Sequence, residues 1–204
     1  MKLSIESFAH IDQSGAYLNG NKILDNSGLT NEDFLLLLYK HIGVKYGKFH
    51  KMDSLCKTAF LTAELLTASG QIISNISPEE KWVVIGNNSS SIVSDKSHVK
   101  EIEDVPSPAV FVYTLPNIML GEICIRHKVM GENSCFQMEE LDVDFIYDYL
   151  TSGFKEDGYS HCITGWVDFD LKSINASLFL ISNSDKGIDF SKESILNLIG
   201  RKTA

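Results

Sequence analysis

Basic residues are in short supply along this chain. Its 204 residues include 18 lysines and arginines against 27 aspartates and glutamates, and the formal net charge is −9. Proteins that bind DNA or RNA need a surplus of lysine and arginine to meet the phosphates, so this charge balance argues against nucleic acid as a partner. The sequence also has no metal-ligand spacing and no Gly-x-x-x-x-Gly-Lys phosphate loop, so we expect neither a bound metal nor another cofactor.

Cysteine pairs and long apolar runs are missing as well. The four cysteines, Cys56, Cys124, Cys135 and Cys162, are far apart, form no Cys-x-x-Cys pair and have apolar neighbours. This usage is typical of reduced, buried thiols in a cytoplasmic protein. The N-terminus lacks the basic segment and apolar core of a signal peptide, and no apolar run approaches the roughly 18 residues of a membrane span. We therefore expect a cytoplasmic protein without a membrane span.

What the sequence does contain is the pattern of a globular protein. It is 44% hydrophobic and 22% charged, no repeat or low-complexity linker divides it, and we predict a single domain over residues 1–204. Apolar alternation or short apolar runs predict strands over residues 3–10, 82–86, 162–168 and 176–182. Apolar residues at helical spacing predict helices over residues 31–42, 51–66, 116–127, 141–151 and 191–199. Strands that alternate with helices predict an α/β fold with a mixed or largely parallel central sheet flanked by helices.

Local signals add detail to these elements. A Gly/Asn-rich loop is expected after the opening strand, Thr30 or Asn31 is the expected N-cap of the first helix, and Gly70 is the expected C-terminal cap of the second. Gly121 lies inside the predicted helix over residues 116–127, where glycine costs about 1 kcal/mol relative to alanine. We therefore expect another backbone to approach Gly121 closely.

The most specific stretch runs from Tyr113 to Asn133 and reads Tyr-Thr-Leu-Pro-Asn-Ile-Met-Leu-Gly-Glu-Ile-Cys-Ile-Arg-His-Lys-Val-Met-Gly-Glu-Asn. Its Leu-Pro-Asn start, small Gly121, Ile-x-Ile-Arg-His turn and closing Gly-x-Asn resemble the helix and strand that lead to the nucleophile elbow of β-ketoacyl synthases, condensing enzymes of the thiolase superfamily. Weaker support, in the family's order, comes from Met52-Asp53, Val83–Gly86 and Gly165-Trp-Val-Asp168. A complete enzyme of that family is about twice as long, so the resemblance implies half of a thiolase-like, ketosynthase fold.

The resemblance also implies where a nucleophilic cysteine belongs, at the tip of a strand-to-helix elbow. Counting forward from Asn133 with the family's spacing reaches Glu140, whereas counting backward from Ser152-Gly153 reaches Cys135. The first count keeps residues 134–138 as the strand before the elbow, and the second removes that strand. We therefore expect Glu140 at the nucleophile position and no catalytic nucleophile in this chain.

Two further observations argue against catalysis. Bulky residues follow Cys135, and nearby carboxylates such as Glu139 and Glu140 would raise its pKa by repelling the thiolate. Two adjacent carboxylates at the start of a helix commonly stabilise that helix through its dipole, so Glu139 and Glu140 need no catalytic role. Ketosynthases also supply two histidines from their C-terminal half to stabilise the oxyanion, and this chain contains no such half. Its own histidines are scattered, at His10, His41, His50, His98, His127 and His161.

The resemblance implies a role in pairing instead. Ketosynthases dimerise through the strand before the elbow, and in type II polyketide systems one partner is a chain length factor, which lacks the cysteine and projects residues into the partner's acyl tunnel. The chain is similar to a truncated subunit of that kind, as found in bacterial aryl polyene clusters. The dimer interface implied in this way comprises Asn133, Ser134, Cys135, Phe136, Gln137 and Met138. The residues implied to wall the partner's tunnel, or else to pack in the core, are Val110, Phe111, Tyr113 and Met119.

Three functional hypotheses follow. The leading one is a non-catalytic subunit that forms a heterodimer or higher assembly with a full-length ketosynthase and shapes its tunnel for polyene, polyketide or fatty-acid-type chains. Because the net charge of −9 repels an anionic acyl carrier protein, we expect that carrier to dock mainly on the partner. The second is a small acyltransferase or thioesterase that uses Cys135 or Glu140. The third is a homodimeric acyl-binding or scaffold protein.

Overall fold

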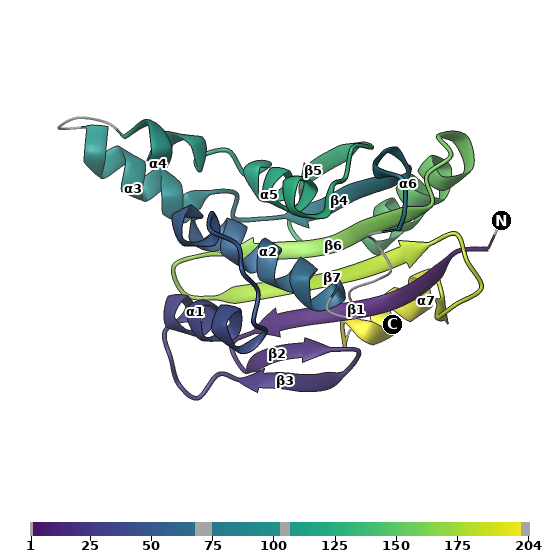
Figure 1. Ribbon diagram of the computed structural model, residues 1–204, viewed down its shortest axis with the longest axis horizontal. Coiled ribbons are helices and arrows are strands. Elements are labelled where there is room, and N and C mark those ends of the chain that lie inside the picture. Colours follow the sequence, from purple (N-terminus) through teal and green to yellow (C-terminus); the bar gives the residue numbers. More distant parts are fainter. Residues whose placement is uncertain (1, 68–74, 103–106, 201–204) are drawn as a thin grey trace.

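The computed structural model describes residues 2–67, 75–102 and 107–200, which form one mixed sheet with helices against both faces (Figure 1). The strands are β1 (Ser4–Asp12), β2 (Gly15–Leu18), β3 (Asn21–Asp25), β4 (Lys81–Asn87), β5 (Asn133–Gln137), β6 (His161–Phe169), β7 (Ile174–Ser182) and β8 (Ile188–Asp189). The helices are α1 (Asn31–His41), α2 (Ser54–Thr67), α3 (Ile92–Ile102), α4 (Pro108–Val112), α5 (Ile118–His127), α6 (Val143–Glu156) and α7 (Lys192–Leu198). Short 3-10 turns occupy Phe49–Lys51 and Pro78–Glu80.

The strands lie in the order β3-β2-β1-β7-β6-β4-β5, with β8 paired to β1. Within the described ranges, only β4 with β5 and β4 with β6 are parallel, and the other neighbours are antiparallel. The predicted α/β fold with a mixed central sheet is therefore confirmed, and the alternative of a largely parallel sheet is wrong. The predicted strand over residues 134–138 is also present, as β5.

Two apolar cores hold the helices to the sheet. Figure 1 looks onto the face covered by α1, α2 and α5, where Phe34, Phe60 and Ile123 are fully buried. On the other face, Ile146 of α6 and Ile195 of α7 belong to the same buried cluster as Trp82. Side chains alternate between the faces of a strand, and β4 is buried along its whole length because both of its faces are covered.

Local chemistry explains where the main helices begin. Thr30 Oγ1 accepts the backbone N–H of Asp33 at 3.2 Å, so the predicted cap of α1 is confirmed in its Thr30 form. Asp142 caps α6 in the same way by accepting the N–H of Phe145 at 2.9 Å. The cap predicted at Gly70 lies outside the described residues.

Several expectations are corrected by the structure. The loop expected after the opening strand is a hairpin made by β2 and β3, and α3 and α4 were not predicted. The predicted helix over residues 116–127 begins at Ile118, after Pro116. No backbone approaches Gly121, because a Cβ built there would meet no atom of the described chain within 4 Å. Of the helices in the described ranges, none combines the length and apolarity needed to cross a bilayer.

Candidate functional site

Strand β5 forms one edge of the sheet, because β4 is its only neighbour among the described strands. The N–H of Val83 donates to the carbonyl of Glu132, and the N–H of Met138 donates to the carbonyl of Asn87, both at 3.0 Å. Backbone groups alternate in direction along a strand, so the even-numbered residues face β4 and the odd-numbered residues 133, 135 and 137 face outward. A row of backbone donors and acceptors is therefore available at this edge.

The side chains of β5 leave this edge open to a second strand. None of the residues in Asn133–Gln137 is charged. The opposite edge strand, β3, carries Lys22 and Asp25, whose Nζ and Oδ1 atoms are 2.7 Å apart. Charged side chains on an edge strand oppose pairing with another chain, so β3 is protected and β5 is not.

The two faces of β5 are anchored differently. Phe136 packs edge-on against Phe145 and Tyr149 of α6, with ring centroids 4.8 and 5.2 Å apart. Cys135 packs against the core under α5, and burial raises the pKa of its thiol to about 11. The reactive thiolate is therefore scarce at neutral pH.

The predicted tunnel residues lie at different depths near α4 and α5. Phe111 is 55% exposed, whereas Met119 is fully buried in the core. Val110 and Tyr113 are half-buried and line a cleft of about 310 Å³ together with Asp53 of the Met-Asp pair. Asp53 Oδ2 accepts the hydroxyl of Ser94 at 2.6 Å, which ties the start of α2 to α3.

Exposed apolar side chains gather on the same segments. They belong to α3, α4, α5 and the chain beside them, which lie along the top of Figure 1, with α5 next to β5. The members are Val99, Ile102, Phe111, Val112, Leu115, Ile125 and Met130. Exposed apolar side chains on neighbouring segments are candidates for a contact surface with another protein.

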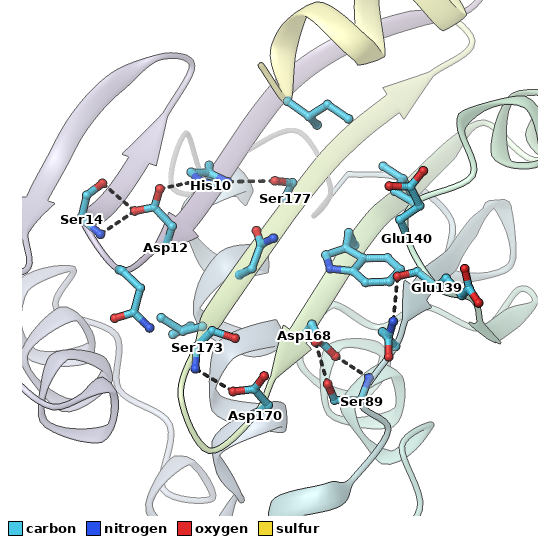
Figure 2. A pocket seen from close by; sticks show the side chains of 17 residues that line it. His10, Asp12, Ser14, Ser89, Glu139, Glu140, Asp168, Asp170, Ser173 and Ser177 are labelled. Carbon is cyan, nitrogen blue, oxygen red and sulfur yellow. Dashed lines mark hydrogen bonds and ion pairs between the residues drawn. The ribbon is translucent and has the colours of Figure 1, made fainter. Parts of the chain in front are cut away.

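A second candidate site is an open cleft of about 830 Å³ at the carboxyl ends of β4 and β6, beside the turn that follows β5 (Figure 2). The carboxyl ends of parallel strands are where open α/β sheets usually bind ligands. Glu140 lines this cleft from the turn between β5 and α6, while Cys135 lies within β5. The assignment of Glu140 to the nucleophile position stays a prediction.

The cleft is strongly acidic. Asp12, Glu139, Glu140, Asp168 and Asp170 line it, and no lysine or arginine is among its described lining residues. The backbone N–H of Ser89 donates to Asp168 Oδ1 at 2.8 Å, and its hydroxyl donates to Asp168 Oδ2 at 2.9 Å. These two hydrogen bonds fix the turn after β4. An anionic ligand is disfavoured here by like-charge repulsion.

One arrangement in the cleft was missed by the sequence analysis. His10 lies between Asp12 and Ser177 and is within hydrogen-bond distance of both (Figure 2). The predicted opening strand ended at His10, whereas β1 continues to Asp12, so the prediction did not place both side chains on one face of a strand. Their partner Ser177 could not be found from the sequence, because it comes from a strand 167 positions away.

Comparison with known proteins places this fold. No family model matches the chain, and no curated protein sequence matches it. A chain of the ishigamide ketosynthase/chain length factor matches with a TM-score of 0.64 and 12% identity, over 91% of this chain and 64% of that one. A chain of AntDE:AntF, a type II polyketide synthase acyl-carrier protein in complex with its ketosynthase bound to the hexaketide, matches with a TM-score of 0.63 and 10% identity, over 89% and 62%.

A third structure is matched almost end to end. It is the ketosynthase ApeO in complex with its chain length factor ApeC from Xenorhabdus doucetiae, with a TM-score of 0.58 and 13% identity over 98% of this chain and 91% of that one. The chain therefore spans less than two thirds of the first two matched chains and nearly all of the third. At these identities the similarity establishes the fold, and the predicted thiolase-like, ketosynthase fold is confirmed.

Proposed function

We propose that the chain is a non-catalytic subunit, similar to a chain length factor, that pairs with an active β-ketoacyl–acyl carrier protein synthase. The observation that carries this proposal is the uncharged edge strand β5, whose odd-numbered residues direct outward backbone groups that pair with no other described strand. In a fold whose solved examples include ketosynthase and chain length factor complexes, such an edge is suited to extending the partner's sheet. Asn133 to Met138 would form the shared strand pair.

The apolar surface next to β5 supports the second half of the proposal, which is control of the partner's acyl tunnel. Phe111 is exposed on α4, and Val110 and Tyr113 lie beside it around the 310 Å³ cleft. An apolar side chain held at a dimer axis can close the end of an acyl tunnel and set the length of polyene or polyketide chains. Met119 is buried in the core, so it would act indirectly, by holding α5 in position.

The carrier protein is proposed to dock mainly on the ketosynthase. The acidic cleft of this chain repels the phosphate of a carrier-bound arm, and none of its described lining residues is a lysine or an arginine. A rival enzyme that uses Cys135 is disfavoured by the raised pKa of that thiol. Conversion of Cys135 to alanine and of Glu140 to glutamine should therefore leave product formation by the complex unchanged, and loss of turnover with the complex intact would support the rival.

Pairing is tested by two substitutions at one position of β5. Cys135→Pro removes an outward-facing N–H without removing a hydrogen bond to β4, and edge strands tolerate proline at such positions. Cys135→Ala removes the same side chain and keeps the N–H. Each variant is co-expressed with full-length ketosynthases that are encoded by neighbouring genes. The complexes are then separated by size-exclusion chromatography. We expect Cys135→Ala to co-elute with a ketosynthase and Cys135→Pro to elute as a folded, unpaired chain.

Two outcomes would contradict the proposal. If Cys135→Pro still forms the complex, β5 does not provide the strand pair. If the unmodified chain forms a stable homodimer that ignores every ketosynthase offered, the acyl-binding or scaffold hypothesis replaces the heterodimer. Ser134→Pro serves as a folding control, because Ser134 directs its N–H toward β4 and its loss should destabilise the isolated chain.

A further inference from the structure

Three side chains in the acidic cleft form a hydrogen-bonded series. Ser177 Oγ lies 2.8 Å from His10 Nδ1, and His10 Nε2 lies 3.0 Å from Asp12 Oδ2 (Figure 2). The register of the sheet creates the series, since His10 on β1 faces Ser177 directly on β7 and Asp12 lies two residues further along the same face. A hydroxyl, an imidazole and a carboxylate in this order are the parts of an activated serine nucleophile.

The hydrogen bonds of Asp12 decide which ring nitrogen of His10 carries the proton. Asp12 Oδ1 accepts the N–H and hydroxyl of Ser14 at 2.7 and 2.6 Å, and Oδ2 faces His10. Burial alone would raise the pKa of Asp12, but the hydrogen bonds from Ser14 and His10 outweigh it and lower the pKa. An ionised carboxylate can only accept, so Nε2 of neutral His10 carries the proton and Nδ1 accepts from the hydroxyl of Ser177. This is the tautomer that a general base requires.

The surroundings of Ser177 suit a neutral acyl group. Ser177 is 5% exposed at the floor of the cleft, and Asn175 extends from the same face of β7 two residues earlier. The side-chain amide of Asn175 makes no hydrogen bond within the described residues, so it is free to donate to a carbonyl oxygen. Trp166, Leu141 and Ile174 add apolar walls. The carboxylates around the rim disfavour anionic substrates.

We propose that Ser177 is the nucleophile of a hydrolytic site for neutral acyl esters, with His10 as its general base and Asp12 as the residue that orients His10. The Ser177 hydroxyl gives its proton to His10 Nδ1 while Oγ forms a bond to the acyl carbon. The C–O bond to the alcohol then breaks, and the alcohol leaves with the proton from Nδ1. A water molecule next gives a proton to Nδ1 and attacks the acyl carbon, and the acid leaves as Oγ regains its proton. One ester and one water thus yield one acid and one alcohol.

This inference is independent of the proposed pairing function, in which the chain is non-catalytic for the condensation reaction that its ketosynthase partner performs. The three residues lie on β1 and β7, away from β5, so hydrolysis and complex formation are separable in experiments. A chain without ketosynthase affinity could still hydrolyse esters, and a pairing subunit could fail to do so.

The direct test uses the unmodified chain of 204 residues and an alkyl fluorophosphonate. The serine oxygen displaces fluoride from phosphorus and forms a stable adduct, which intact-mass measurement and peptide mapping locate. We expect one adduct per chain, on the peptide that contains Ser177. Ser97 is the internal comparison, because it is exposed and, among the described residues, its hydroxyl donates only to the carbonyl of Val93, at 3.1 Å. An unreacted chain, or adducts spread over exposed serines such as Ser97, would overturn the proposal.

Turnover is measured with p-nitrophenyl butanoate on identically purified variants whose folding is checked by thermal unfolding. Ser177→Ala and His10→Ala should each lower the rate by about 100-fold or more, the usual contribution of such groups. Asp12→Asn should lower it while leaving the adduct on Ser177, and Ser97→Ala should keep the full rate. Equal rates in the unmodified chain and His10→Ala would refute the assignment. If Ser177→Ala does not fold, the adduct position and the Asp12→Asn rate decide the question.

Discussion

Arg126 on α5 donates two hydrogen bonds to Glu64 on α2, from Nε to Oε1 at 2.8 Å and from Nη2 to Oε2 at 3.0 Å. Glu64 is nearly buried, with 6% of its side chain exposed, while 33% of Arg126 is exposed. The arginine belongs to the Ile-Arg-His motif that first indicated the fold. Its contact with Glu64 shows that the motif fixes α5 onto α2, the long helix that packs on the sheet.

The first prediction concerns this ion pair. Arg126→Met leaves Glu64 without its cation and should lower the free energy of unfolding by about 2–3 kcal/mol, less than for a fully buried pair because water screens Arg126. Glu64→Gln combined with Arg126→Met should recover part of that loss, since no uncompensated charge remains. Urea unfolding followed by circular dichroism measures both. A double variant less stable than the single one would show that the pair acts through packing instead.

The second prediction concerns stability at low pH. Burial lowers the pKa of His127 to about 4; Glu64 opposes this shift, and Arg126 and Lys81 add to it. The ring Nε2 lies 3.3 Å from Glu64 Oε1, without the alignment of a hydrogen bond. Because the unfolded chain takes up this proton near pH 6.5 and the folded chain does not, stability should fall as pH drops from about 6.5 to 4, by roughly 3 kcal/mol.

The control for this prediction is a second histidine. His127→Gln should flatten the loss of stability between pH 6.5 and 4, whereas exposed His41→Gln should leave it unchanged. Some slope of the same sign will remain, because burial also lowers the pKa of His161. Unfolding curves at a series of pH values test the prediction, and it fails if both variants keep the full slope.

The third prediction compares two helical glycines. A Cβ at Gly153 in α6 would overlap the indole ring of Trp82, whereas a Cβ at Gly121 in α5 would meet nothing within 4 Å. Gly153→Ala should therefore cost about 1–3 kcal/mol through overpacking. Gly121→Ala should stabilise the isolated chain by about 0.5–1 kcal/mol, because alanine favours helix. Thermal unfolding of the unpaired chain measures both, and shifts of the same sign would contradict the local geometry.

The elements that were predicted correctly share a strong local signal. β4, β6 and β7 are buried on both faces, so their apolar runs are long enough to recognise, and Thr30 caps α1 as its side chain suggests. The missed hairpin had a signal too. Asn19 and Gly20 both have positive φ, 51° and 80°, and an Asn-Gly pair is typical of a two-residue hairpin turn. The flanking strands are too short for alternation to reveal them.

The two candidate sites also differ in how much local sequence signal they have. β5 follows a recognisable motif, so the strand over residues 134–138 was anticipated from the resemblance alone. The cleft brings together residues from β1, β6, β7 and the turn after β5, and its composition depends on which strands become neighbours. Pairings such as that of His10 with Ser177 are set by the packing of the whole sheet, which no local pattern encodes.

The last prediction addresses the partner's tunnel and rests on the pairing proposal. Phe111→Ala removes a side chain that is 55% exposed, so the stability of the isolated chain should change by no more than about 0.5 kcal/mol. In complex with the ketosynthase, the same variant should lengthen the products, because a bulky apolar side chain at the end of the tunnel is lost. Mass spectrometry of the released chains measures the length distribution.

Two comparison variants separate tunnel effects from folding effects. Val99→Ala removes an exposed apolar side chain from α3, 63% exposed, and should leave both stability and product length unchanged. Met119→Ala creates a cavity in the core and should cost about 2–5 kcal/mol, which reduces the amount of complex. If Phe111→Ala and Val99→Ala give the same products as the unmodified complex, Phe111 does not wall the tunnel. If all three variants alter product length in proportion to their loss of stability, the effect comes from folding and not from the shape of the tunnel.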